Sequence, residues 1–111
     1  MCKVWLDDLR DPKDPFIQTN YGADGTEVWV KSVQEALTLL ETGTVTSISL
    51  DNDLGEGLPE GYNVALWLEQ AAYFNWIPRL KIWAHSDNCV ANPRMRKAIE
   101  NAYRYWERHA H

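Results

Sequence analysis

Four short apolar runs, each flanked by polar or turn-forming residues, set the main constraint on how this 111-residue chain folds. Their lengths and their content of Val, Ile, Leu and Trp are typical of buried strands. The four runs are residues 3–6, 27–30, 45–50 and 79–84. In the last of them Leu80 and Ile82 alternate with Lys81 and Trp83, which predicts a strand near the edge of a sheet.

Helical patterns follow the second, third and fourth apolar runs. Ser32 and Glu35 form a capping box that opens one helix, and Gly43 is placed to end it. A second amphipathic pattern predicts a helix over about residues 62–74. Pro93 suits the first turn of a last helix, whose apolar stripe we expect to pack in the core.

The stretch between the first two runs has a different composition. Residues 9–27 are rich in Pro, Asp, Asn and Gly and show neither a helical nor a strand period, so we expect a long loop there. Elsewhere strands alternate with helices, which predicts a mostly parallel sheet with right-handed crossovers. In such sheets ligands bind at the carboxyl ends of the strands.

The composition is that of one globular domain, which we place at residues 1–111. Apolar residues make up 45% and charged residues 24% of the chain. We expect most of the six tryptophans to fill a core, with a stacking role for one or two left open. The two cysteines are too few for a disulfide framework, and no secretory or membrane-spanning segment is visible. These features predict a cytoplasmic protein without a membrane partner, and no protein partner is evident.

Charge is segregated along the chain. The net charge of −5 argues against a general nucleic-acid coat protein. Residues 94–108 nevertheless hold five basic and only two acidic side chains. This segment is either a solvated helix face or a surface for RNA, with Arg94 and Arg96 the best candidates for ligand contact.

Paired acids follow two of the predicted strands. Asp7 and Asp8 come directly after the first run, and Asp51 and Asp53 follow the third. One interpretation is that they cap strands and turns, as aspartates often do. The other is that they meet at one edge of the sheet, where like charges need a hard cation between them. Mg²⁺ or Mn²⁺ with Asp7, Asp8 and Asp51 as ligands then fits best, and Asp53 supports the site through its backbone carbonyl.

Further polar residues are expected at the same edge. His85 and Ser86 end the fourth run, and a histidine there can transfer protons near neutral pH. Ser86, Asn88, Arg94 and the amide groups of the last helix's first turn are suited to binding phosphate oxygens, and Arg10 can clamp a phosphate. Taken one at a time, each of these residues has an ordinary structural explanation. Their convergence favours a site.

The arrangement resembles the receiver domain of two-component signalling. In that resemblance Asp7 and Asp8 match the acidic metal-binding pair, Asp51 matches the phosphoacceptor, and Ser86 matches the conserved hydroxyl position. The receiver lysine that follows a fifth strand has no counterpart in this sequence. The implied fold is α/β: a truncated receiver-like (flavodoxin-like) three-layer structure of about four mostly parallel strands with flanking helices.

A closer resemblance covers nearly the whole chain. Four motifs occur in the order found in the cyclic-phosphate-processing receiver-like family: WLDDLRDP, SLDNDLG, GYNVALWL and HSDNCVANPRM. The sequence departs from the family pattern at Asn52, where His is usual, at Cys89, where Pro is usual, and at Ala91, where Gly is usual. The Asn52 departure bears on catalysis most directly.

The resemblance implies processing of a cyclic phosphate on a nucleotide or an RNA end. We therefore hypothesise a metal-dependent phosphoesterase in which His85, Asp51 and Ser86 are the catalytic residues. Asp51 either binds the metal ion or attacks phosphorus directly. Two alternatives remain: a signalling receiver phosphorylated on Asp51, and a non-catalytic module that binds a cyclic nucleotide.

Overall fold

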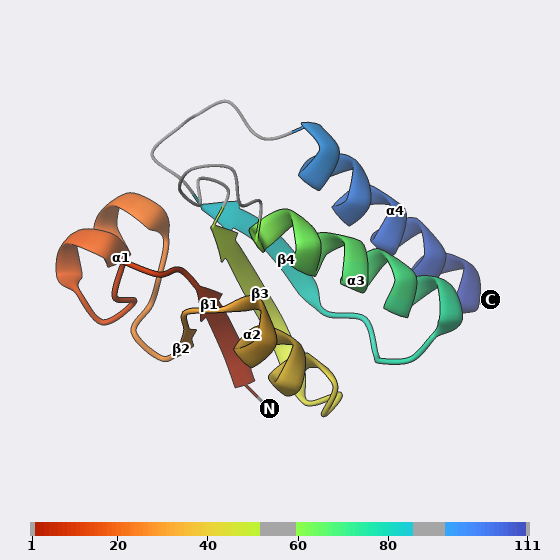
Figure 1. Ribbon diagram of the computed structural model, residues 1–111, viewed down its shortest axis with the longest axis horizontal. Coiled ribbons are helices and arrows are strands. Elements are labelled where there is room, and N and C mark those ends of the chain that lie inside the picture. Colours follow the sequence, from red (N-terminus) through yellow and green to blue (C-terminus); the bar gives the residue numbers. More distant parts are fainter. Residues whose placement is uncertain (1, 52–59, 86–92, 111) are drawn as a thin grey trace.

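A computed structural model describes residues 2–51, 60–85 and 93–110, with the backbone alone at residues 51, 60, 61, 85, 93 and 94. Strands and helices alternate regularly along this part of the chain (Figure 1). The strands are β1 (Cys2–Leu6), β2 (Val28–Val30), β3 (Val45–Asp51) and β4 (Lys81–His85). The helices are α1 (Pro15–Tyr21), α2 (Val33–Leu40), α3 (Glu60–Phe74) and α4 (Pro93–His109).

The strands form one parallel sheet in the order β2-β1-β3-β4. This topology confirms the predicted parallel sheet with helical crossovers. It also places β4 at an edge, as the alternation of Lys81 and Trp83 with Ile82 predicted. Because all four strands run the same way, their carboxyl ends lie along one side of the sheet (Figure 1).

Helices cover the two faces of the sheet unequally. Val4, Leu6, Ile48 and Leu50 point to the face covered by α2, α3 and α4, and all four are essentially inaccessible to solvent. Trp5 points to the other face, where it packs with residues of and around α1. The result is the expected three-layer α/β fold, with its larger core on the side where α3 and α4 lie next to each other (Figure 1).

The expected long loop over residues 9–27 is wrong, because α1 lies within it. Asp14 caps this helix by accepting a hydrogen bond from the Phe16 N–H at 2.9 Å, and Pro15 fits its first turn. Gly22, with φ of 86°, ends the helix and donates its N–H to the Gln18 carbonyl. Seven residues are too few to show a clear apolar period, so the caps were the only usable signal.

The other predicted helices are confirmed with small shifts in their bounds. The Ser32 hydroxyl accepts the Glu35 N–H at 3.2 Å at the start of α2, as the capping box predicted. Gly43 lies beyond the end of α2 with φ of 73°, a conformation that favours glycine. The helix expected at 62–74 begins two residues earlier, at Glu60.

The outer edge of β4 is closed by a side chain from α4. The Tyr103 hydroxyl accepts the Ile82 N–H at 2.6 Å and donates to the Ile82 carbonyl at 3.3 Å. Edge strands expose unpaired backbone groups that invite pairing with another strand. Tyr103 satisfies the edge at Ile82, so α4 takes the place that a further strand would occupy there.

Candidate functional site

The carboxyl ends of three neighbouring strands are aligned. Leu6 of β1 is the register partner of Leu50 in β3, and Asp51, the next residue of β3, is the partner of His85 in β4. Asp7 follows Leu6 directly, so positions 7, 51 and 85 lie side by side across the sheet. The sequence placed Asp51 after its strand, whereas it is the last residue of β3.

Asp7 is the best-defined acid at this edge, and its side chain is completely buried. Its Oδ1 atom accepts the backbone N–H groups of Leu9 and Arg10 at 2.9 and 3.1 Å. Its Oδ2 atom accepts Nη1 of Arg10 at 3.0 Å. These bonds occupy three of the roughly four acceptor positions of a carboxylate. Asp7 therefore shapes the turn after β1 in addition to bearing charge at the edge.

Arg10 is held from two sides. Its guanidinium pairs with Asp7, and its Cζ atom lies 4.6 Å from the centre of the Tyr21 ring, where it makes a cation–π contact. The side chain is only 15% exposed. The predicted role of Arg10 in phosphate binding stays a prediction. The structure shows the Arg10 guanidinium fixed beside the Asp7 carboxylate.

Two tryptophans anchor the same turn, a role that the sequence did not indicate, since it predicted core packing for most tryptophans and left a stacking role open for one or two. The Trp5 indole N–H donates to the Arg10 carbonyl at 3.1 Å, and the Trp29 indole N–H donates to the Asp7 carbonyl at 2.7 Å. The Asp7 N–H in turn donates to the Val30 carbonyl at 3.1 Å. The segment that carries the acidic pair is thus fixed by β1 itself and by the neighbouring strand β2.

Asp8, the second acid of the pair, is exposed to solvent at the same turn. The remaining candidates, Asp53, Ser86 and Asn88, lie outside the described residues, as does the side chain of Arg94. Within the described part of the chain, no group of three or more His, Cys, Asp or Glu side chains is placed to hold a metal ion. The predicted metal set includes Asp51, of which only the backbone is described, so that set stays a prediction.

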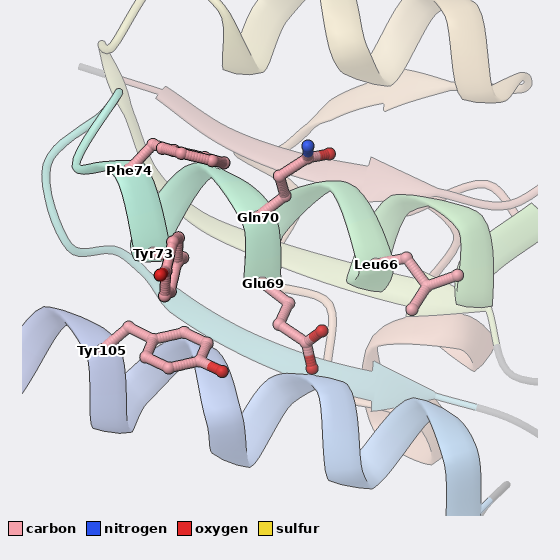
Figure 2. A pocket seen from close by; sticks show the side chains of 6 residues that line it. All are labelled: Leu66, Glu69, Gln70, Tyr73, Phe74 and Tyr105. Carbon is pink, nitrogen blue, oxygen red and sulfur yellow. The ribbon is translucent and has the colours of Figure 1, made fainter.

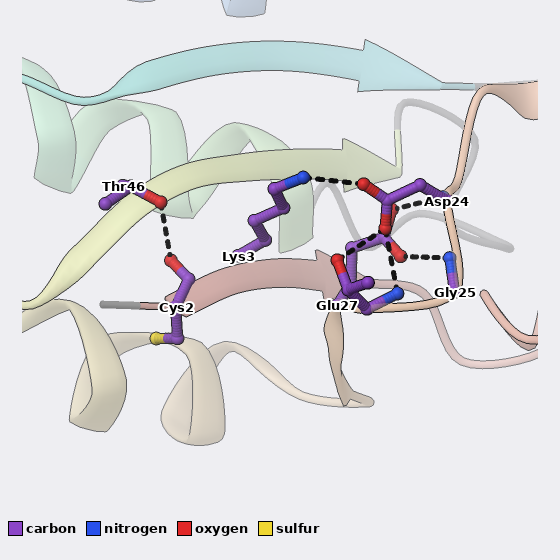
Figure 3. A network of polar contacts seen from close by, with 7 residues as sticks. Cys2, Lys3, Asp24, Gly25, Glu27 and Thr46 are labelled. Atoms are coloured by element: carbon purple, nitrogen blue, oxygen red, sulfur yellow. Dashed lines mark hydrogen bonds and ion pairs between the residues drawn. The ribbon is translucent and has the colours of Figure 1, made fainter.

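A polar network links Lys3 of β1 to the loop between α1 and β2 (Figure 3). Lys3 Nζ lies 2.6 Å from Asp24 Oδ2, and Asp24 Oδ1 accepts the hydroxyl and the N–H of Thr26. The bond from Lys3 is the largest of the effects that lower the pKa of the Asp24 carboxyl below its usual value. The same bond raises the pKa of Lys3. This network fixes the loop between α1 and β2.

A surface pocket of about 390 Å³ lies elsewhere, on α3 and α4 (Figure 2). It is lined by Leu66, Glu69, Gln70, Tyr73, Phe74 and Tyr105. The helix that follows a parallel strand runs back along the sheet, so the aromatic residues near the end of α3 are remote from the carboxyl edge. The pocket is separate from the predicted site.

A parallel sheet ordered β2-β1-β3-β4, with acids at its carboxyl edge, defines a receiver-like α/β domain. The family model of the cyclic-phosphate processing receiver domain matches residues 2–101, nearly the whole chain. The chain therefore belongs to that family, as its four motifs predicted. No curated protein and no solved structure matches the chain significantly. In the described residues, no helix is long and apolar enough to span a lipid bilayer.

Proposed function

We propose that this receiver domain is a metal-dependent phosphoesterase that hydrolyses a cyclic phosphate on a nucleotide or an RNA end. The observation that supports it best is the alignment of positions 7, 51 and 85 at the carboxyl ends of adjacent strands. This edge is where parallel α/β sheets bind ligands. The description of the family, cyclic-phosphate processing, supports a cyclic phosphate as the reacting group.

The acids of this edge suit Mg²⁺ or Mn²⁺. Carboxylate oxygens are the ligands that hard divalent cations prefer, and the described part of the edge offers the exposed Asp8 beside the buried Asp7. In the proposal Asp8 and Asp51 hold the ion, Asp7 completes the set, and Asp53 supports it. A bound ion polarises the phosphoryl group and lowers the pKa of a bound water.

Hydrolysis breaks the bond between phosphorus and one ribose oxygen and forms a bond from phosphorus to a water oxygen. One proton leaves the attacking water, and one must reach the departing ribose oxygen. His85 is assigned both transfers, since a histidine can accept and donate protons near neutral pH. Ser86, Asn88, Arg94 and the amide groups at the start of α4 are assigned to the non-bridging oxygens.

Arg10 is assigned to binding the phosphate and offsetting its charge in this proposal. Its guanidinium is fixed by Asp7 and by the Tyr21 ring, so it does not need to become ordered when an anion arrives. A cation that is already in place can offset the charge that develops on the phosphoryl oxygens. Asp7 thus supports the site through Arg10 as well as through its own charge.

A signalling receiver is the second candidate. Asp51 is the last residue of β3, the position that matches the phosphoacceptor of receiver domains. In that case Asp51 would carry a phosphoryl group and no cyclic phosphate would be opened. A module that binds a cyclic nucleotide without turnover is the third candidate, and Asn52 in place of the family's usual His keeps it open.

The test is a panel of cyclic phosphates assayed with Mg²⁺ and with Mn²⁺. The panel contains RNA ending in a 2′,3′-cyclic phosphate, mononucleotide cyclic phosphates and cyclic oligonucleotides. Asp51→Asn and His85→Ala should abolish turnover. The matched controls Glu107→Gln and His109→Ala alter residues in the last turn of α4, away from the aligned strand ends (Figure 1), and should retain it. Equal activity in all four variants would show that the assigned site is wrong, and binding without turnover would favour the third candidate.

A further inference from the structure

Trp83 is a tryptophan of the sheet that is nearly half exposed to solvent. Trp83 lies in the middle of β4, and 46% of its surface is exposed. Its indole makes no hydrogen bond and no ring contact with any other residue in the described ranges. Leaving a large aromatic side chain in water forgoes the free energy that its burial would contribute. Packing among the described residues therefore leaves nearly half of the Trp83 side chain available for contact with a ligand.

The other tryptophans provide the comparison. Trp5 and Trp106 are buried, and Trp29 is partly buried and bonded to the Asp7 turn. Trp76 is slightly more exposed than Trp83, at 53%, but it stacks on Phe74 with ring centres 5.3 Å apart. Trp76 thus belongs to an aromatic cluster on α3 and the turn after it. Trp83 differs from them in combining substantial exposure with no ring contact to a described residue.

The strand register fixes which face of the sheet carries Trp83. Trp83 is the partner of Ser49, and Ser49 is the partner of Trp5. Register partners on neighbouring strands project to the same side, so Trp83 shares the face of Trp5, opposite the core under α2, α3 and α4. It lies two residues, about 6.6 Å of strand, before the carboxyl end of β4.

A cation lies next to Trp83 on the same face. Lys81 is two residues earlier in β4, is exposed, and forms no ion pair with a described residue. Its register partner Ser47 lies beside Lys3, whose ammonium group is already paired with Asp24. In a chain with a net charge of −5, an unpaired lysine beside an open indole is a local feature that suits an anion with an aromatic part.

We propose that Trp83 stacks the base of the nucleotide that bears the cyclic phosphate and that Lys81 binds the backbone phosphate of the preceding nucleotide. The substrate class is then an RNA end rather than a small cyclic phosphate. This inference rests on the proposed function, because it places the cyclic phosphate at the carboxyl edge beyond Trp83. Aromatic side chains on an open sheet face are a common platform for single-stranded bases, and stacking tolerates any base.

Binding is measured without turnover by fluorescence anisotropy of a labelled RNA oligonucleotide that ends in a 2′,3′-cyclic phosphate, with divalent ions removed. Trp83→Ala should weaken binding by roughly 5- to 150-fold, and Trp83→Phe should remain close to wild type. Trp76→Ala is the matched control, because Trp76 is a similarly exposed tryptophan in another part of the molecule, and it should bind normally. Lys81→Ala should lower the salt dependence of binding by about one unit of slope.

Turnover then separates this inference from the proposed function. Cyclic glycerol phosphate carries the reactive group without a base, so Trp83→Ala should leave its hydrolysis unchanged while lowering kcat/KM for the RNA end. If wild type hydrolyses both substrates and Trp83→Ala matches Trp76→Ala throughout, the base platform is refuted and the proposed function stands. If Trp83→Ala weakens RNA binding but wild type hydrolyses neither substrate, the platform is supported and the proposed function fails. A change of oligomeric state in Trp83→Ala with normal RNA binding would make the face a protein interface and refute the platform.

Discussion

The Oδ2 atom of Asp7 lies 3.0 Å from the Nη1 atom of Arg10, and the Asp7 carboxylate that accepts this bond is completely buried. A buried carboxylate is costly unless its charge is offset, and Arg10 offsets it from three residues along the chain. The same carboxylate closes the turn after β1 through two backbone N–H groups. Charge compensation and turn geometry therefore depend on one side chain.

Removing this cation should destabilise the fold. Arg10→Ala removes the cation that pairs with the buried Asp7 carboxylate, and we expect the free energy of unfolding to fall by about 3 kcal/mol. Urea denaturation measures this change in the free energy of unfolding. Arg104→Ala removes an exposed arginine with no bond to the described residues and should change stability little. Equal stability of the two variants would mean that Asp7 does not depend on Arg10.

The hydroxyl of Tyr103 should protect the edge of β4. Tyr103→Phe leaves the N–H and the carbonyl of Ile82 without their partner, at a cost of about 1–2 kcal/mol. We also expect faster hydrogen exchange at the Ile82 amide, which NMR measures directly. Tyr105→Phe on the same helix is the matched control, because the Tyr105 hydroxyl has no hydrogen bond within the described residues. Unchanged exchange in Tyr103→Phe would contradict the proposed closure of this edge.

The ion pair of Lys3 and Asp24 predicts two pH dependences of opposite sign. Asp24 has a lowered pKa in the folded state, so its contribution to stability is present above 3.8 and is lost as the pH falls through the folded value. Lys3 has a raised pKa, so its contribution is present below 10.5 and is lost as the pH rises through the folded value. Both groups are solvent-exposed, so these contributions are small.

Lys3→Ala should raise the pKa of Asp24 toward 3.8, and the bonds from Thr26 should keep it below that value. An NMR titration of the Asp24 carboxyl carbon measures the shift. Lys31→Ala is the control, because Lys31 lies over the Trp29 ring and does not contact Asp24. An unchanged Asp24 pKa in Lys3→Ala would refute the pairing.

The cap of α1 is a further test of the fold. Asp14→Ala removes the acceptor of the Phe16 N–H and should cost about 1 kcal/mol of stability, with fraying visible in the chemical shifts of α1. Lys13→Ala, one residue earlier and exposed, should leave α1 intact. An unchanged α1 in Asp14→Ala would mean that packing of Ile17 alone holds the helix.

The sequence was sufficient to predict the strands and helices whose apolar residues recur in a regular pattern. The apolar runs gave the strands, and the alternation of strands and helices gave the parallel sheet and the shared edge. The sequence did not predict α1, because this helix of two turns buries only Ile17 and therefore shows no hydrophobic period. Its caps at Asp14 and Gly22 were visible in the sequence but were assigned to a loop.

The bonds around the candidate site could not be foreseen in the same way. The indole of Trp29 reaches the Asp7 carbonyl across 22 residues, and Tyr103 reaches Ile82 across 21. Such contacts depend on how strands and helices dock, and spacing along the chain does not encode them. The chemistry assigned to Asp7 from the sequence likewise did not include its burial or its bonds to the turn.

The most direct test of the central claim is the reaction of the wild-type protein with RNA ending in a 2′,3′-cyclic phosphate, carried out with Mg²⁺ in heavy-oxygen water. Mass spectrometry of the RNA then reports whether the ring has opened. We predict a phosphomonoester product that contains one solvent oxygen and does not form with Asp51→Asn. Intact cyclic RNA, together with a stable phosphoryl adduct on Asp51 after treatment with a small phosphodonor, would contradict the proposal and identify a signalling receiver.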